Sequence, residues 1–110
     1  MSSLISQMPP KLEFSTHALK DLEEVWIHFS EANEETASKV LRQITDMSSK
    51  LLSFPKIGKE RNDLLLNMRS LLAGQFFIFF QDTDFGIEII RVLHSSRNIE
   101  RVFEEMLPLE

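Results

Sequence analysis

Residues 69–98 read RSLLAGQFFIFFQDTDFGIEIIRVLHSSRN, and this stretch decides the fold. Two runs rich in β-branched and aromatic residues, Gln75–Gln81 and Ile87–Ser95, flank a turn segment that contains aspartate and glycine. This pattern predicts a β-hairpin, and Met68–Leu72 is predicted as a third strand before it. The two main runs are apolar almost without interruption, which is typical of central strands that are covered on both faces.

Upstream of this hairpin, the sequence predicts a short strand and two helices. Lys11–Ser15 alternates polar and apolar residues, as a half-buried strand does. One helix is expected from Ser15 or Thr16 to about Ala32, and a second from Asn33 to about Phe54, where a proline follows.

Each predicted helix carries one apolar stripe at three- and four-residue steps. The stripes contain Ala18, Leu19, Leu22, Val25, Trp26 and Phe29 in the first helix, and Ala37, Val40, Leu41, Ile44, Met47 and Leu51 in the second. The acidic residues Asp21, Glu23 and Glu24 are expected on or near the solvent side of the first helix.

The predicted element order is β-α-α-β-β-β-α, with a terminal helix at Ile99–Met106 that Asn98 caps. This order indicates an α+β two-layer sandwich, in which a helical hairpin packs on a mainly antiparallel sheet. Residues 1–10 are interpreted as a flexible lead-in and residues 11–107 as a single domain. The helical hairpin covers one face of the central strands, so the other face must be covered by the terminal helix, the lead-in or a partner.

Composition excludes several classes of function. The 110 residues include no cysteine, so a disulfide framework, a thiol nucleophile and a cysteine-ligated metal are excluded, and a reducing cytoplasm is the expected location. The longest apolar run near the hairpin, Phe76–Phe80, is too short to span a membrane. A net charge of −5 does not favour nucleic-acid binding. His17 and His28 are far apart, and neither a metal site nor a cofactor motif is indicated.

The chain resembles the RelE/ParE toxin superfamily, and the ParE-like (plasmid stabilisation) branch in particular, over roughly Leu12 to Phe103. The resemblance rests on short segments in this order: Phe14-Ser15, Ala18, Asp21–Trp26, Phe54-Pro55, Gly58-Lys59, Met68–Leu71, Gly74, Phe76–Phe80, Ile89–His94 and Arg97.

The resemblance implies the toxin of a type II toxin–antitoxin pair, silenced by a cognate antitoxin, ParD-like or other, whose flexible tail wraps it. ParE-like members bind and block DNA gyrase, whereas RelE-like members cut messenger RNA on the ribosome. Both branches share the fold, so the fold does not choose between them. A homodimer or a heterotetramer with the antitoxin is compatible with either branch.

A ribonuclease would need a general base, a general acid and cations at the phosphate. His94 has the right titration range, and Arg69, Arg91 and Arg97 could hold phosphate. However, Arg91 and His94 are three residues apart in one strand, so alternation places them on opposite faces unless a bulge intervenes. The chain also has no tyrosine, which the nuclease branch typically carries. His94 is therefore expected to bond to backbone or a carboxylate, and Arg91 to join the sheet to the terminal helix through a paired charge.

The apolar excess of the strands favours a binding function over an enzyme. Two short helices cannot bury all the phenylalanines of Phe76–Phe80 together with Ile90. A groove for an amphipathic helix or an added strand explains this, with a homodimer or the terminal helix as alternative covers. Trp26 fits either the core or an interface. The residues predicted to contact a partner are Trp26, Leu65, Phe77, Phe79, Arg97 and Phe103. Gyrase inhibition is the preferred function; a RelE-like endoribonuclease and a non-toxic interaction module remain as alternatives.

Overall fold

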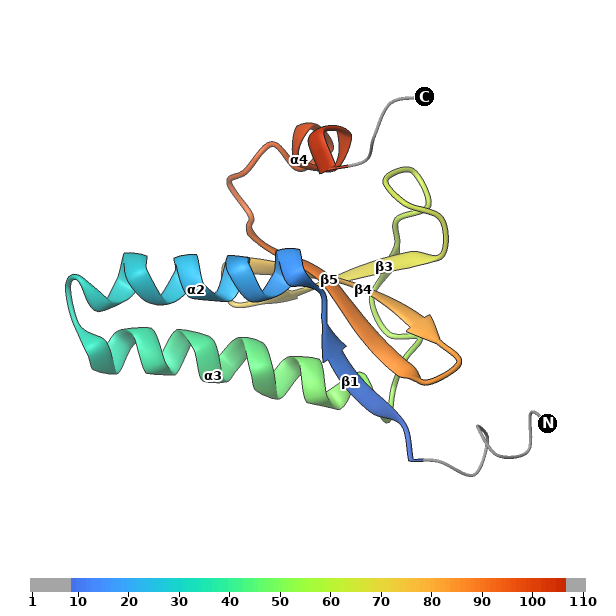
Figure 1. Ribbon diagram of the computed structural model, residues 1–110, viewed down its shortest axis with the longest axis horizontal. Coiled ribbons are helices and arrows are strands. Elements are labelled where there is room, and N and C mark those ends of the chain that lie inside the picture. Colours follow the sequence, from blue (N-terminus) through green and yellow to red (C-terminus); the bar gives the residue numbers. More distant parts are fainter. Residues whose placement is uncertain (1–8, 107–110) are drawn as a thin grey trace.

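The computed structural model describes residues 9–106, so the predicted lead-in at residues 1–10 lies outside the described residues except for Pro9 and Pro10, as does residue 107. The elements are, in chain order, β1 (Lys11–Phe14), α2 (Thr16–Ser30), α3 (Glu34–Lys50), β2 (Lys59–Glu60), β3 (Met68–Ala73), β4 (Phe76–Thr83), β5 (Gly86–His94) and α4 (Ile99–Met106). Figure 1 shows α2 and α3 as an antiparallel pair and α4 set apart from them. The predicted α+β class and element order are confirmed, with β2 added.

The five strands form one mixed sheet in the order β1-β5-β4-β3-β2. Every neighbouring pair is antiparallel except β1 and β5, which run parallel. β2 was missed because it has only two residues, and such a short strand shows no alternation. It lies between α3 and β3, where the predicted element order has no strand.

Gly86 allows β1 to approach β5 closely. Its φ of 137° is one that residues with a side chain rarely adopt. A Cβ atom at this position would also collide with the backbone of Lys11. Because Gly86 lacks that atom, the amide of Lys11 can donate to the carbonyl of Phe85 at 2.8 Å and start the parallel pairing.

The predicted caps of the helical hairpin are confirmed. Ser15 Oγ accepts from the amide of Ala18 at 3.0 Å, and Asn33 Oδ1 accepts from the first-turn amides of α3.

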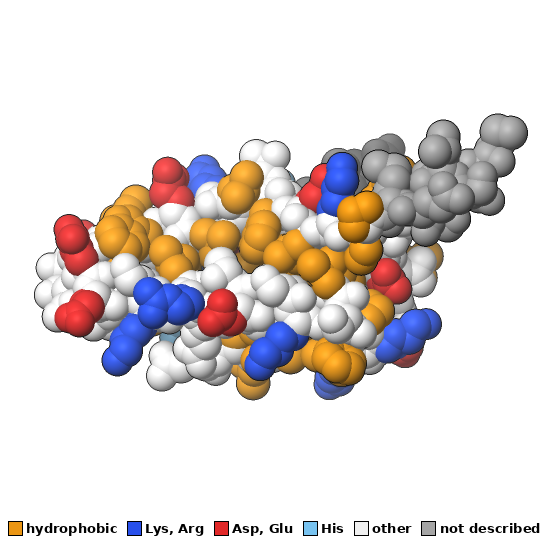
Figure 2. Space-filling view, turned by 90° about the horizontal axis from the view of Figure 1, so that it is seen from below, with side chains coloured by type: hydrophobic (Ala, Val, Ile, Leu, Met, Phe, Trp, Pro, Cys, Tyr) orange, Lys and Arg blue, Asp and Glu red, His pale blue; other side chains and the backbone are white. Residues whose placement is uncertain are grey.

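Leu19 was expected in the buried stripe but is 56% exposed. The buried side of α2 is centred on Ala18 and Val25, and Leu19 lies about 100° around the helix from Ala18. Seen from the side of α3, hydrophobic side chains form a band along the molecule (Figure 2).

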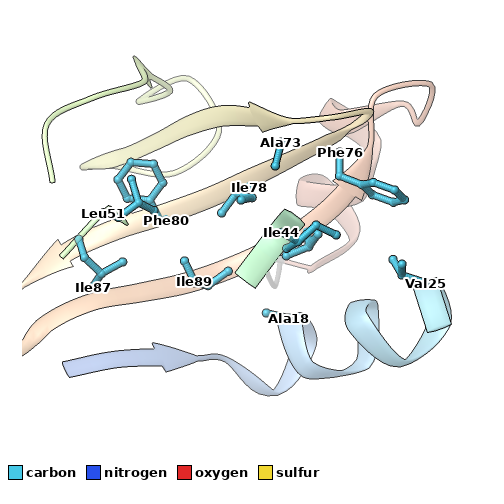
Figure 3. Close-up of a cluster of buried hydrophobic side chains, with 11 residues drawn as sticks. Ala18, Val25, Ile44, Leu51, Ala73, Phe76, Ile78, Phe80, Ile87 and Ile89 are labelled. Atoms are coloured by element: carbon cyan, nitrogen blue, oxygen red, sulfur yellow. The ribbon is translucent and has the colours of Figure 1, made fainter. Parts of the chain in front are cut away.

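The main core lies between the helical hairpin and the sheet. Eleven buried residues form it, among them Ile44 and Leu51 of α3, Ile78 and Phe80 of β4, and Ile89 of β5 (Figure 3). Phe80, Ile44, Ile78 and Ile89 are all fully buried. Burial of this apolar surface is the main source of stability on this side of the sheet.

A second core lies on the opposite face of the sheet. Its buried members are Met68, Phe79, Ile90, Leu93, Ile99, Val102 and Phe103. The prediction that both central strands are covered on both faces is therefore confirmed. The terminal helix, the lead-in and a partner were the three expected covers for this face. In the structure the terminal helix α4 covers it and contributes Ile99, Val102 and Phe103.

β5 contains a bulge at Ile90. Phe79 pairs with Arg91 while Phe80 pairs with Ile89, which leaves Ile90 without an opposite residue. The hydroxyl of Ser15 donates to the carbonyl of Ile90 at 2.7 Å, so the unpaired residue keeps a hydrogen-bond partner. The bulge precedes Arg91, so it does not alter the alternation between Arg91 and His94.

Candidate functional site

The edge of β5 is covered by a strand over only part of its length. β1 ends at Phe14, and the amide of Ser15 donates to the carbonyl of Ile89 at 2.9 Å as the chain turns into α2. The remainder of β5, Arg91–His94, therefore runs beside a helix. Its outward backbone groups need side-chain partners, water or another chain.

Asp21 takes the place of a strand partner at this edge. Its carboxylate accepts from the amide of Val92 at 2.9 Å and from Nε and Nη2 of Arg91, both at 2.8 Å. Only 6% of Asp21 is exposed, so the expectation that it lies near solvent is wrong. A carboxylate can be buried here because it accepts three hydrogen bonds, one of them from a peptide group that has no strand beside it.

Arg91 is paired, as predicted, but with α2 rather than with the terminal helix. The hydrogen bonds with Asp21 hold the pKa of Arg91 above its ordinary value, so the guanidinium stays charged. Its contact with α4 is a weak one, from Nη1 to the sulfur of Met106 at 3.7 Å. Arg91 therefore serves to hold β5 against α2.

A groove of about 500 Å³ lies between α2 and the end of β5. Its lining combines apolar side chains with five ionisable ones: Val25, Phe29, Phe76, Val92 and Leu93 with Asp21, Glu24, His28, His94 and Arg97. Of the residues proposed for a nuclease, His94 and Arg97 both line this groove. An apolar lining with a few polar groups is the usual composition of a ligand-binding pocket.

His94 is engaged on both ring nitrogens. Nδ1 accepts from the amide of Ser96 at 3.0 Å and lies 2.8 Å from its hydroxyl oxygen. Because Nδ1 accepts, the neutral ring carries its proton on Nε2, which lies 3.2 Å from Oε1 of Gln75. The edge of the ring also meets Phe76, with centroids 5.2 Å apart. The predicted bond between His94 and backbone is confirmed.

Arg69 lies away from this groove, on β3. It donates to the carbonyls of Lys56 and Gly58 and to Glu60, at 3.1–3.2 Å. β4 separates β3 from β5, and Arg69 is level with Phe80 and Ile89, whereas His94 is opposite Phe76. At 3.3 Å per residue, this places Arg69 and His94 roughly 15 Å apart along the strand direction alone. The structure does not bring the four candidate nuclease residues together.

The residues predicted to contact a partner fall into two groups. Trp26 is 36% exposed on α2, Arg97 is exposed, and Leu65 and Phe77 are half-buried. Phe79 and Phe103, in contrast, are buried against each other, with ring centroids 5.0 Å apart. The structure corrects the expectation for these two, because α4 already covers the position that a partner was expected to take.

An uncovered part of the sheet remains beyond α4. Leu72 of β3 pairs with Phe77 of β4, and both lie on the face that carries the second core. Leu72 is 50% exposed. Leu72 is not among the residues predicted to contact a partner, although its position two residues after the buried Ser70 places it on the same face.

Within residues 9–106, no group of three or more histidine, cysteine, aspartate or glutamate side chains is arranged to hold a metal ion. None of the helices in the described part of the chain is both long and apolar enough to cross a membrane.

Comparison with known proteins identifies relatives of one kind. A model of the ParE toxin of the type II toxin–antitoxin system, parDE, matches residues 12–99. The chain is similar to Toxin ParE1 of Mycobacterium tuberculosis, from strains CDC 1551 / Oshkosh and ATCC 25618 / H37Rv. Each is 27% identical over 96 residues, which cover 86% of this chain and 98% of the relative. A chain of the chromosomal ParDE TA system from P. aeruginosa has a similar fold, with a TM-score of 0.67 and 21% identity over 78% of this chain and 96% of that chain.

Proposed function

We propose, from the premise that the chain belongs to the ParE toxin family of type II toxin–antitoxin systems, that it is the toxin of such a pair. A cognate antitoxin neutralises it, and its target is DNA gyrase, which it inhibits by protein–protein contact without catalysis. Its site of action is the cytoplasm.

The dispersal of the candidate nuclease groups is the observation that carries this proposal. Arg91 is bound to Asp21, and Arg69 is bound to two loop carbonyls and Glu60. A phosphate at Arg69 or Arg91 would have to compete with these partners. Among residues 9–106, Arg97 is the one arginine or lysine that lines the groove with His94. General acid–base chemistry needs its groups within reach of one reacting phosphate, so this arrangement favours binding over cleavage.

The uncovered apolar surface at Leu72 and Phe77 supports an antitoxin partner. The pair continues the apolar face beyond α4, and apolar contacts at the centre of an interface supply most of its affinity. The solved relative from P. aeruginosa is itself described as a ParDE TA system. An apolar segment of the antitoxin is the occupant we propose for this surface.

The target is tested with two assays on the same purified protein. Gyrase supercoiling is expected to fall as the protein is titrated, and message on ribosomes is expected to stay intact. Supercoiling that persists across a wide range of protein concentration would refute the gyrase target. Ribosome-dependent cleavage of the message, lost in His94→Ala, would establish the endoribonuclease alternative, which the shared groove of His94 and Arg97 favours.

The antitoxin surface is tested by affinity measurement with the product of the neighbouring reading frame. Replacing Leu72 and Phe77 together by lysine is expected to raise the dissociation constant about tenfold or more, because two charges then face an apolar segment. Phe85→Lys is the matched control, since Phe85 is 54% exposed on the β4–β5 turn. Equal loss in both variants would show that the surface at Leu72 has no special role.

A further inference from the structure

The outer face of the helical hairpin carries an exposed apolar ridge that nothing in the described chain covers. Leu19, Trp26 and Ile27 of α2 are 56%, 36% and 53% exposed. Leu19, Glu23 and Trp26 follow each other at steps of four and three residues, so they share one side of the helix. Large apolar side chains gathered in this way mark an interaction surface more often than scattered ones do.

Charged side chains of opposite sign accompany this ridge on the two helices. On α3, Arg42 and Asp46 each lie two residues, about 200° of rotation, from the fully buried Ile44, so they point away from the core. On α2, Glu23 has the same relation to the buried Val25. Seen from the side of α3, charged side chains of both signs lie beside hydrophobic ones (Figure 2).

The charges also match in height along the hairpin. The two helices run antiparallel from the turn around Ala32, so positions equally distant from Ala32 lie level. Glu23 is nine residues before Ala32 and Arg42 is ten after it; Lys20 is twelve before it and Asp46 fourteen after it. None of these four residues takes part in an ion pair within residues 9–106.

We propose that this face binds a second copy of the chain in a two-fold symmetric dimer. A two-fold axis parallel to the hairpin places α2 of one copy on α3 of the other. Level positions stay level under this operation, so Glu23 meets Arg42 of the second copy and Lys20 meets its Asp46. Each contact occurs twice because the interface is isologous, and Leu19 and Trp26 fill its centre.

The charge pattern is the reason for choosing a second copy as the occupant. A uniformly acidic partner would be repelled by Glu23 and Asp46, and a uniformly basic one by Arg42 and Lys20. A second copy supplies the opposite sign at both places. Complementary charges of this kind fix the register of an interface more than they raise its affinity. The dimer does not depend on the chain's being a toxin.

The test is a charge swap followed by analytical ultracentrifugation of the purified full chain. Glu23→Arg and Arg42→Glu are each expected to raise the dimer dissociation constant about tenfold or more, because each creates two like-charge contacts. The double variant Glu23→Arg/Arg42→Glu is expected to recover most of the lost affinity. Glu104→Arg on α4 and Lys59→Glu on β2 are matched reversals at exposed positions off the face and are expected to leave the constant unchanged.

Trp26 provides an independent readout because it is the only tryptophan. Its emission is expected to shift to shorter wavelength as the protein concentration rises and the indole leaves water. Circular dichroism of every variant shows whether the fold is intact. A wild-type chain that stays monomeric up to about millimolar concentration, or folded single variants that dimerise like the wild type, would overturn the proposal. So would a monomer whose Glu23→Arg variant instead loses antitoxin or gyrase binding, since the face then belongs to that partner.

Discussion

The two faces of the sheet are covered in different ways. The helical hairpin buries eleven residues with the sheet and is also tied to β5 by Ser15 and Asp21 through hydrogen bonds. The helix α4 covers the other face with Ile99, Val102 and Phe103. Its last residue, the half-buried Met106, packs against the same core. Among the hydrogen bonds of residues 9–106, only the weak contact of Arg91 with Met106 links α4 to a strand.

This difference shows how one sheet can combine a side fixed by directional hydrogen bonds with a side held mainly by apolar contacts. Directional bonds to the edge of β5 set the register of α2, because Asp21 must meet both Val92 and Arg91. Apolar burial is non-directional, so it stabilises α4 without fixing it to particular backbone groups. We therefore expect the same kind of substitution to cost more on the hairpin side.

The largest effect is expected for Phe80→Ala in the main core. Phe80 is fully buried between the sheet and the hairpin, and neither layer can move inward while the edge bonds hold. The cavity and the lost transfer free energy together are expected to lower the free energy of unfolding by about 3–5 kcal/mol. Urea denaturation monitored by circular dichroism measures this. A loss below about 1 kcal/mol would show that the hairpin relaxes freely.

Asp21→Ala is expected to lower the free energy of unfolding by about 3 kcal/mol, because it leaves the Arg91 guanidinium, on a side chain only 13% exposed, without its carboxylate partner. The amide of Val92 loses its acceptor as well. The control is Asp21→Ala combined with Arg91→Leu, which removes the orphaned charge and is expected to recover part of the loss. If the double variant were as unstable as the sum of both single ones, the pair would contribute no coupling.

Phe103→Ala is expected to cost about 2 kcal/mol, less than Phe80→Ala although both rings are buried. The helix α4 can loosen without breaking bonds to the sheet, so no rigid cavity remains. Amide hydrogen exchange is expected to accelerate in α4 and to stay slow in α2. Equal acceleration in both helices would indicate that the two faces unfold together, and the contrast between them would be lost.

The sequence predicted the features that depend on neighbouring residues. The caps at Ser15 and Asn33, the paired strands and the double-sided burial of β4 all follow from local pattern. The burial of Asp21 could not be predicted in this way. It depends on where β1 ends, because this leaves the amide of Val92, 71 residues after Asp21, without a strand partner.

The candidate site was predictable to the same extent. The separation of Arg91 from His94 follows from alternation within one strand, and the predicted bond of His94 to nearby backbone is made to the amide of Ser96. The position of Arg69 depends on strand order, because β4 lies between β3 and β5. Burial of Phe79 and Phe103 depends on the path that the chain takes after His94, which pattern alone does not give.

The smallest effect is expected for His94→Ala. His94 is the last residue of β5, beyond the part of the strand that the helical hairpin and α4 cover. The ring is only half-buried, and its partners Ser96 and Gln75 can turn to water once it is removed. The free energy of unfolding is therefore expected to fall by less than about 1 kcal/mol. Growth arrest on expression is expected to persist, since the proposed gyrase contact needs no general base. A stable His94→Ala protein that no longer arrests growth would instead assign His94 to the site of action and move the functional surface to the open edge of β5.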